Sequence, residues 1–369
     1  MPEPAISSSR PRVLSGMRPT GKLHLGNYMG ALANWVKLQD RYECYFFIAD
    51  VHALTTDYAD TSNIVSNTLE VALDFLAAGL DPEKSIIFVQ SHVKQHFELP
   101  MYLGMITPLG WLERVPSYKE MQENLTSKDL TTYGFLGYPV LMASDILLYQ
   151  PDFVPVGQDQ QAHVELTREV ARRFNHFYPK IRMPLPEGDD PAAETIEQWS
   201  KIPDRDRFVL PEPDVLLTPS PKLPGTDGRK MSKSYGNTIL MTDPEPVVRQ
   251  KLKTMVTDPA RIRRTDPGDP DKCPVGDLHK VFSTPETLAK VYDGCRSAGI
   301  GCIECKRWAA DILVQILEPL QTRRAGFSDS QVEEILAAGS SRASRRAEQT
   351  MEEVRAAMQL TSASRQTGN

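Results

Sequence analysis

Short apolar runs alternate with helical segments through the first 90 residues, and this alternation restricts the possible folds more than any other feature. Residues 13–15, 45–50 and 85–90 form continuous apolar runs, typical of parallel strands that are covered on both faces. Between them, residues 27–39 and 62–79 carry apolar side chains at helical spacing. The pattern predicts right-handed βαβ units, and hence an α/β fold with a Rossmann-like, doubly wound parallel sheet.

The predicted strands end beside residues that suit a ligand site. Gly16, Asp50 and Gln90 stand at the carboxyl ends of the three apolar runs. Doubly wound sheets bind their ligands at these strand ends. The sequence therefore predicts a binding site at this edge of the sheet.

Composition is that of an ordinary globular protein. The chain has 369 residues, 40% of them hydrophobic and 24% charged, which suits about two domains. No apolar run approaches the roughly 20 residues that span a bilayer, and the N-terminus lacks the apolar core of a signal peptide. We therefore expect a cytoplasmic protein with no membrane association. The net charge of −6 argues against broad nonspecific binding of nucleic acid, although a local basic patch could still contact RNA.

The chain divides by composition. We expect a disordered leader, a Rossmann-like domain, a helical domain and a frayed tail; the respective ranges are 1–12, 13–245, 246–360 and 361–369. Separate helices are expected over 330–338 and 341–358. A stretch rich in proline and acidic residues, at about 181–207, reads as an insertion in the Rossmann-like domain.

Two segments suit phosphate binding. Residues 15–27 read as a strand end, a glycine-rich turn and a helix start, which would offer backbone N–H groups to phosphate. Residues 228–234, Gly-Arg-Lys-Met-Ser-Lys-Ser, form a predicted mobile loop with two ammonium groups, Lys230 and Lys233. Such groups can stabilise charge that moves along a phosphate chain during reaction.

Asp145 lies within an otherwise apolar helical pattern, Tyr138–Tyr149. An unpaired carboxylate would be costly there, so it requires a hydrogen-bond donor. The donor could be an indole N–H of a substrate, or an N–H or arginine of the protein itself. Both alternatives stay open at this point.

Four of the five cysteines cluster in the C-terminal part, as Cys273, Cys295, Cys302 and Cys305, with spacing C-x21-C-x6-C-x2-C. Disulfides are not expected in a cytoplasmic chain, so the grouping indicates a metal site. Structural zinc usually takes two close pairs of ligands, whereas this asymmetric spacing favours a 4Fe–4S cluster. Zinc is the alternative, and four unligated thiols are the remaining possibility.

Taken together, His24-Leu-Gly-Asn27 and Lys230-Met-Ser-Lys-Ser234 resemble the HIGH and KMSKS signatures of class I aminoacyl-tRNA synthetases. The block from Tyr138 to Thr167 is similar to the tryptophan-specific branch, and the cysteines resemble its subgroup with a 4Fe–4S cluster. The resemblance runs from about residue 13 to 358. One departure is Arg18, which stands where many members carry glutamine.

The resemblance implies a site residue by residue. It implies catalytic roles for Lys230, Lys233 and Lys119. For ATP binding it implies Arg18, Pro19, Thr20, His24, Gly26, Asn27, Gly157, Gln158, Asp159, Lys230, Met231, Ser232, Lys233 and Ser234. For the amino acid it implies that Asp145 accepts a hydrogen bond from the indole N–H. The other residues implied to bind the amino acid, as an apolar wall and its neighbours, are Met142, Leu14, Gly16, His52, Val154, Val156 and Gln160. For the cluster it implies Cys273, Cys295, Cys302 and Cys305.

The implied reaction joins L-tryptophan to ATP, with Mg²⁺, as an adenylate and then transfers the acyl group to the 3′ end of tRNA(Trp). The resemblance also implies that residues 13–245 are the catalytic domain, that residues 246–360 bind the tRNA, and that the enzyme is a homodimer. The alternatives are tyrosine specificity, a nucleotidyltransferase, a catalytically silent paralogue that binds tRNA or tryptophan, and an iron–sulfur RNA-binding module. Asp145 and the valines favour indole, and the intact turn and lysine loop favour an active enzyme.

Overall fold

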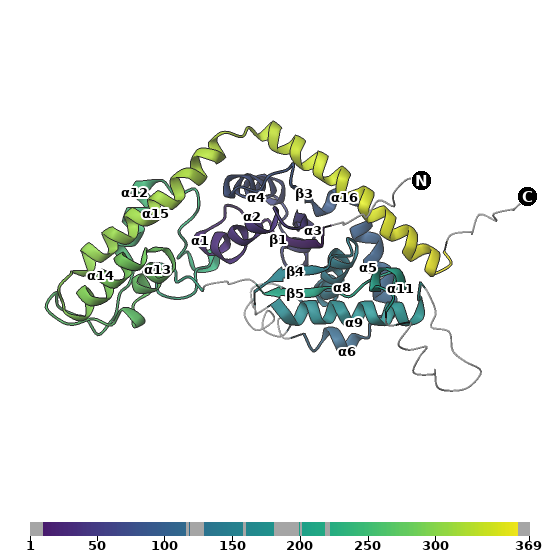
Figure 1. The fold of residues 1–369 in the computed structure, drawn as a ribbon, viewed down its shortest axis with the longest axis horizontal. Coiled ribbons are helices and arrows are strands. Elements are labelled where there is room, and N and C mark those ends of the chain that lie inside the picture. The colour runs from purple at the N-terminus through teal and green to yellow at the C-terminus, as the bar shows by residue number, and fades with distance from the viewer. Residues whose placement is uncertain are drawn as a thin grey trace, which may run out of the picture.

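A computed structural model describes residues 10–115, 118, 129–157, 160–180, 199, 201–217 and 222–360. Its centre is a five-stranded sheet in which every strand pairing is parallel, in the order β3-β2-β1-β4-β5 (Figure 1). The strands are β1 (Arg12–Met17), β2 (Glu43–Ile48), β3 (Ser85–Val89), β4 (Phe153–Val156) and β5 (Asp214–Leu217). The strand order reverses between β1 and β4, which confirms the predicted doubly wound sheet and places its ligand crevice there.

Successive residues of each strand enter two different cores, because side chains alternate across a pleated sheet. Val13 and Phe46 pack into one core, and Leu14 and Phe47 pack into the other. Trp35 stacks on Phe46 in the first core with ring centroids 4.7 Å apart. Both faces are therefore apolar, which explains why the strands read as continuous apolar runs.

Helices cover both faces of the sheet. The first core receives side chains from α1 (Leu25–Asn27), the π-helical turn η1 (Tyr28–Leu32), α2 (Ala33–Leu38) and α4 (Ile64–Ala78). The second receives them from α5 (Gln95–Ile106), α8 (Tyr133–Leu147) and α9 (Gln161–Phe177). Shorter helices are α3 (Asp50–Asp57), η2 (Gln90–His92), α6 (Leu109–Leu112), α11 (Asp204–Arg207) and η4 (Lys233–Tyr235).

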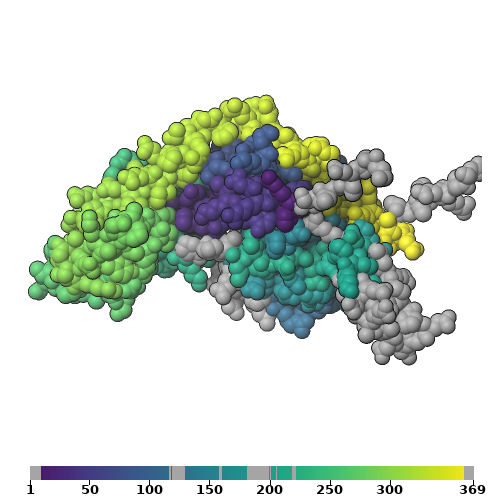
Figure 2. Space-filling view, in the orientation of Figure 1, coloured from purple at the N-terminus to yellow at the C-terminus, as the bar shows by residue number. Residues whose placement is uncertain are grey.

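The C-terminal region is helical, as predicted. It contains α12 (Glu245–Thr254), η5 (Pro270–Lys272), α13 (Pro274–Phe282), α14 (Pro285–Arg296), α15 (Cys302–Ala325) and α16 (Asp329–Ala357). The last two helices form an arch over α4 and β3 in Figure 1, and in Figure 2 they make a ridge along one edge of the molecule. The sequence pattern suggested separate helices over 330–338 and 341–358, which was wrong, because α16 continues through Gly339.

Helix α16 protects the free edge of β3. Gly339 lies against the β3 backbone so closely that an added Cβ would be 1.8 Å from the carbonyl oxygen of Ile87. The hydroxyl of Ser340 accepts a hydrogen bond from the Val89 N–H at 3.4 Å. A capped edge strand cannot pair with another chain. A helix from the C-terminal region thus completes the sheet layer, and the division into domains at residue 245 stays a prediction.

In the described part of the chain, no helix is both long and apolar enough to cross a membrane. Strand β1 begins at Arg12, inside the range expected for the leader. Residues 1–9, 361–369 and most of the predicted insertion at 181–207 lie outside the described residues.

Candidate active site

The turn after β1 is organised by a reciprocal cap at the start of α1. His24 Nδ1 accepts a hydrogen bond from the Asn27 N–H at 3.3 Å, and Asn27 Oδ1 accepts one from the His24 N–H at 3.1 Å. Burial, and then Lys233 and Lys230, lower the pKa of His24 to about 4, so the ring is neutral near pH 7. Because Nδ1 is an acceptor, the proton lies on Nε2, which can donate to a ligand.

Gly26 permits this arrangement. A Cβ at Gly26 would lie 2.8 Å from the His24 ring, so any other residue would displace that ring. Gly16 has a similar constraint, since its Cβ would lie 2.4 Å from the ring of Phe47. Glycine at these two positions therefore reflects close packing in the site.

The lysine loop is held by Asn237, a residue that the sequence pattern did not single out. Its Oδ1 accepts from the Ser232 N–H at 2.8 Å, and its Nδ2 donates to Asp227 Oδ1 at 2.7 Å and to the Lys230 carbonyl at 3.2 Å. Asn237 is only 2% exposed. The loop is thus tied across its base by one buried amide.

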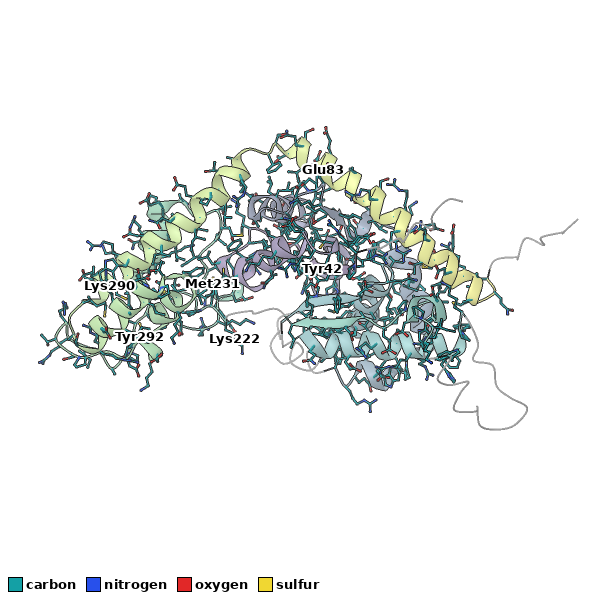
Figure 3. All side chains as sticks on the ribbon, viewed as in Figure 1. Tyr42, Glu83, Lys222, Met231, Lys290 and Tyr292 are labelled. Atoms are coloured by element: carbon teal, nitrogen blue, oxygen red, sulfur yellow. The ribbon has the colours of Figure 1, made fainter. Side chains whose placement is uncertain are left out.

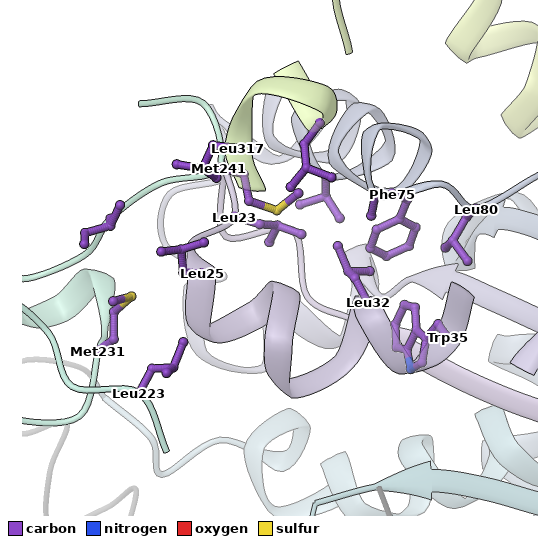
Figure 4. Packing of buried hydrophobic residues seen from close by; sticks show 14 of the residues in the cluster. Leu23, Leu25, Leu32, Trp35, Phe75, Leu80, Leu223, Met231, Met241 and Leu317 are labelled. Atoms are coloured by element: carbon purple, nitrogen blue, oxygen red, sulfur yellow. The ribbon is translucent and has the colours of Figure 1, made fainter. Parts of the chain in front are cut away.

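The two motifs share one apolar core. Met231 in the lysine loop is 4% exposed and belongs to the same cluster as Leu23 and Leu25, which flank His24 (Figure 4). The backbone beyond the loop pairs with the same turn: the Leu25 N–H donates to the Ile239 carbonyl at 2.9 Å. Residues more than two hundred positions apart are therefore fixed against each other.

Lys230 and Lys233 lie differently. Lys230 lines the larger of two cavities described below, whereas Lys233 does not. The Nζ of Lys233 donates instead to the Thr20 and Gly21 carbonyls, each at 2.8 Å, and to Thr20 Oγ1 at 3.2 Å. Burial lowers the pKa of Lys233 to about 8. Ser234 is exposed in η4 and lies outside the lining of this cavity.

An apolar cavity of about 310 Å³ opens between β1 and β4. It brings together every residue predicted for the amino acid: Leu14, Gly16, His52, Met142, Asp145, Val154, Val156 and Gln160. Trp35, Phe47 and Ile146 also contribute to its wall, and the sequence pattern did not single them out. Burial, and then Arg18, lower the pKa of His52 to about 3, so the His52 ring in this wall is neutral near pH 7.

Asp145 is the carboxylate in this wall, and it is 2% exposed. Its oxygens accept from Gln90 Nε2 at 2.8 Å, and its Oδ1 lies 2.6 Å from His96 Nδ1. The alternative of a donor from the protein itself is therefore confirmed. Asp145 nevertheless faces the cavity, where a ligand can reach it.

A larger cavity of about 890 Å³ lies beside the first one. His24, Gly26, Asn27, Lys230, Met231 and Ser232 line it, together with Lys222 and Tyr235, which the sequence pattern missed. Figure 3 places Lys222 and Met231 where the sheet meets the helical C-terminal region. The two cavities share a wall made by Met17, Gly30, Ala31, Gly157 and Gln160.

Besides Lys233 and Ser234, three described residues predicted for nucleotide binding lie outside the lining of this cavity. Arg18 lines the apolar cavity, and its guanidinium donates to Asp57 at 2.9 Å. Pro19 is buried and lines neither of the two cavities, and Thr20 contacts Lys233. Lys119, Gln158 and Asp159 lie outside the described residues.

The four clustered cysteines come from three helices. Cys273 precedes α13, Cys295 lies in the last turn of α14, and Cys302 and Cys305 lie in the first turn of α15. Burial, and then the proximity of the other three thiols, raise the pKa of Cys305 to about 12. Among the residues that the structure describes, no three His, Cys, Asp or Glu side chains stand ready to hold a metal ion.

The fold and site define a class of protein. A doubly wound sheet carries, at its switch point, an apolar cavity with one buried carboxylate, and beside it a cavity lined by two lysines and a helix start. Such an arrangement suits a small apolar molecule beside a phosphate-bearing one, which is what the resemblance to class I synthetases implies.

Comparison with known proteins identifies the family. Residues 7–318 match the family described as "tRNA synthetases class I (W and Y)". The chain is 49% identical to the tryptophan–tRNA ligase of Ralstonia nicotianae, covering 95% of this chain and 98% of that protein. It is 48% identical to the tryptophan–tRNA ligase of Thermotoga maritima, covering 95% and 99%. The chain therefore belongs to the class I tRNA synthetases for tryptophan and tyrosine.

Solved structures agree. The tryptophanyl-tRNA synthetase of Campylobacter jejuni, in complex with ADP and tryptophan, matches with a TM-score of 0.78 and 30% identity, covering 94% of this chain and 99% of that one. The tyrosyl-tRNA synthetase of Archaeoglobus fulgidus, with L-tyrosine, has the same fold at a TM-score of 0.59 and 22% identity, covering 86% and 91%. The fold is thus common to both branches of the family.

Proposed function

We propose that this chain is a tryptophan–tRNA ligase. It activates L-tryptophan with ATP to tryptophanyl adenylate and transfers the acyl group to the 3′ end of tRNA(Trp). One observation carries the proposal: the apolar cavity with Asp145 adjoins the cavity with Lys230 and His24 through a shared wall. An amino acid bound in the first cavity would hold its carboxylate beside the triphosphate in the second.

In the activation step, a carboxylate oxygen of tryptophan attacks the α-phosphorus of ATP. The bond from that phosphorus to the bridging oxygen breaks, and pyrophosphate leaves with the electron pair. His24 donates from Nε2 to a phosphate oxygen, and Lys230 and Lys233 stabilise the charge on the departing pyrophosphate. Orientation and electrostatics supply the acceleration without a covalent intermediate on the protein.

Lys233 has to change partners for this role. Its ammonium is bonded to the carbonyls of Thr20 and Gly21, outside the lining of the larger cavity. A triphosphate would offer it a stronger, charged acceptor. We propose that ATP draws Lys233 from these carbonyls into the site.

Mg²⁺ is expected with ATP and would neutralise part of the triphosphate charge. The described residues that line the larger cavity include no Asp or Glu. Phosphate oxygens and water would therefore hold the ion, which is its usual mode of binding beside nucleotides.

In the transfer step, a hydroxyl of the terminal ribose of tRNA attacks the carbonyl carbon of the adenylate, and AMP leaves. The decisive test of the proposed function is amino-acid-dependent exchange of pyrophosphate into ATP. Exchange with tryptophan and not with tyrosine is the expected result. Exchange with tyrosine alone would reassign the specificity, and exchange with neither would favour a silent paralogue.

We also propose a 4Fe–4S cluster on Cys273, Cys295, Cys302 and Cys305, with zinc as the alternative. Four thiols that share one region support the proposal, although no three potential ligands among the described residues are placed where one metal ion could be held. Arg261 Nη1 lies 3.7 Å from Cys295 Sγ and would offset the negative charge of the thiolates. The cluster would brace the helical region and supply no step of the reaction above.

Metal analysis of anaerobically purified protein tests this assignment. We expect about four irons per chain and broad visible absorbance, both lost in Cys302→Ser. One zinc per chain without iron would select the alternative. Absence of both metals would leave four free thiols.

We further propose that the enzyme is a homodimer. Three large apolar side chains that line one groove are exposed in the single chain: Met101 by 52%, Leu109 by 64% and Tyr133 by 79%. The groove, of about 310 Å³, is lined by residues of α3, α5, α6 and α8. Apolar surface of this kind commonly forms an interface between subunits.

A further inference from the structure

Behind Asp145 lies a buried polar chain that takes no part in the cavity wall. His96 Nδ1 is 2.6 Å from Asp145 Oδ1, and His96 Nε2 is 2.8 Å from the hydroxyl of Tyr149. Gln90 Nε2 is 2.8 Å from both oxygens of Asp145. His96, Gln90 and Tyr149 are each 0% exposed, so no solvent can replace these partners.

The direction of each hydrogen bond in this chain can be assigned. Burial, and then the proximity of Asp145, raise the pKa of Tyr149 well above its ordinary value, so its hydroxyl keeps the proton and donates to His96 Nε2. Nδ1 of His96 is then the donor to Asp145. Burial raises the pKa of Asp145, while His96 and Gln90 act in the opposite direction. Both partners therefore favour the carboxylate, which is an acceptor only.

Neighbouring residues fix the orientation of both partners. The rings of Phe47 and Phe88 pack on His96, with centroids 5.8 and 5.9 Å away. Gln90 also receives a hydrogen bond from the His52 N–H, at 3.0 Å from its Oε1. His52 belongs to α3 and Asp145 to α8, and both line the apolar cavity. Gln90 therefore connects two walls of the cavity.

These contacts occupy one side of the carboxylate. Asp145 Oδ1 accepts from both His96 and Gln90, whereas Oδ2 has Gln90 as its only partner among the hydrogen bonds of the described residues. A carboxylate oxygen has two lone pairs, so Oδ2 keeps acceptor capacity. An aromatic ring with an N–H donor could fill it, whereas a ring without such a donor would leave a buried acceptor unpaired.

We propose that His96 and Gln90 are specificity-determining positioning residues, which hold Asp145 as an acceptor for the ring N–H of the amino acid substrate. The inference rests on the proposed function and deepens it. Neither residue touches the substrate, and each acts through Asp145.

The test compares tryptophan with β-(3-benzothienyl)alanine, in which sulfur replaces the ring N–H. Pyrophosphate exchange gives kcat/KM for each substrate in the wild type, His96→Phe, His96→Asn and Gln90→Met. We expect the wild type to prefer tryptophan by about 10- to 100-fold, the value of one buried hydrogen bond. His96→Phe and Gln90→Met should each reduce this ratio at least about fivefold, through lower kcat/KM for tryptophan. His96→Asn keeps an N–H near the Nδ1 position and should restore most of the preference.

The matched control is Ser144→Ala, next to Asp145 on α8. Ser144 is also fully buried, but its hydroxyl donates to the Val140 carbonyl and not to Asp145. The ratio should be unchanged in this variant. Because each ratio compares two substrates on one protein, partial loss of folded protein cancels, and Gln90→Met tests the same chain if His96→Phe does not fold.

An unchanged ratio in both His96→Phe and Gln90→Met would overturn the inference. If kcat/KM falls equally for the two substrates in these variants, the role of the two residues is merely structural. Absence of exchange with tryptophan in the wild type would overturn the proposed function itself, and so separates the two failures.

Discussion

Lys233 and Asp145 are ionisable residues that make hydrogen bonds within the protein, and a prediction about function follows from each. Lys233 is bonded to two backbone carbonyls, and Asp145 to an amide and an imidazole. Hydrogen bonds with such partners lower the cost of burying a polar group. Each residue can therefore exchange or add a partner when substrate binds.

Replacing Asp145 with alanine should lower kcat/KM for tryptophan, with a loss of transition-state stabilisation of about 2–3 kcal/mol. The reason is that a charge-assisted hydrogen bond to the ring N–H is lost. Pyrophosphate exchange measures this directly, and KM for ATP should change little. An unchanged kcat/KM for tryptophan would remove Asp145 from the site.

ATP binding at pH 8 should be accompanied by proton uptake. The pKa of Lys233 is lowered to about 8, so about half of the free protein lacks this charge at that pH. Anionic phosphate favours the ammonium and would raise the pKa, so a proton is taken up on binding. Calorimetric titration in buffers of different ionisation enthalpy measures the uptake.

The control is Lys233→Arg, whose guanidinium stays charged and should abolish the uptake at pH 8. At pH 6.5 the wild type should take up almost no proton, since Lys233 is already charged there. Equal uptake in both proteins at pH 8 would show that another group is responsible. The same argument predicts weaker ATP binding above pH 8.

Among the elements, α16 depends most on a single small residue. Gly339 allows the helix to lie directly on β3, and a Cβ there would collide with the carbonyl of Ile87. Backbone on both sides of the contact leaves no flexible side chain to move aside. The helix would have to shift away from the strand.

Gly339→Ala should therefore lower the free energy of unfolding by about 1–3 kcal/mol, although alanine favours helix. Urea denaturation followed by circular dichroism measures the change. Ala338→Ser, on the exposed side of the same helix, is the control and should change stability by less than about 0.5 kcal/mol. A more stable Gly339→Ala protein would contradict the close contact.

At the scale of helices and strands, the sequence predicted the structure where a local pattern determines it. The first three strands, the first helices and the two motifs predicted to bind phosphate follow from apolar periodicity and turn residues, whereas β4 and β5 were not predicted. Asn237, Lys222 and Gln90's contact with Asp145 were not predictable, because they depend on which distant segments meet. Gly339 was misread for the same reason: in isolation, glycine indicates a helix end.

At the scale of the whole molecule, the described residues leave uncovered the apolar groove that is lined by α3, α5, α6 and α8. If this surface joins two subunits, Met101→Asp should give monomers, because a carboxylate would be buried without a partner. Sedimentation velocity measures the oligomeric state. Ile303→Asp is the control, since Ile303 is 81% exposed on α15, far from α5 in Figure 1, and should leave the dimer intact. A monomeric wild type would refute the proposed homodimer.

Helix α15 connects two distant parts of this molecule. Cys302 and Cys305 lie at its start, and near its end Arg324 pairs with Asp74, whose Oδ2 accepts from the Leu23 N–H at 2.7 Å, one residue before His24. At about 1.5 Å per residue, its 24 residues form a rod roughly 36 Å long. The helix therefore makes one continuous connection, through Arg324 and Asp74, between the cysteine end of the C-terminal region and the turn before His24.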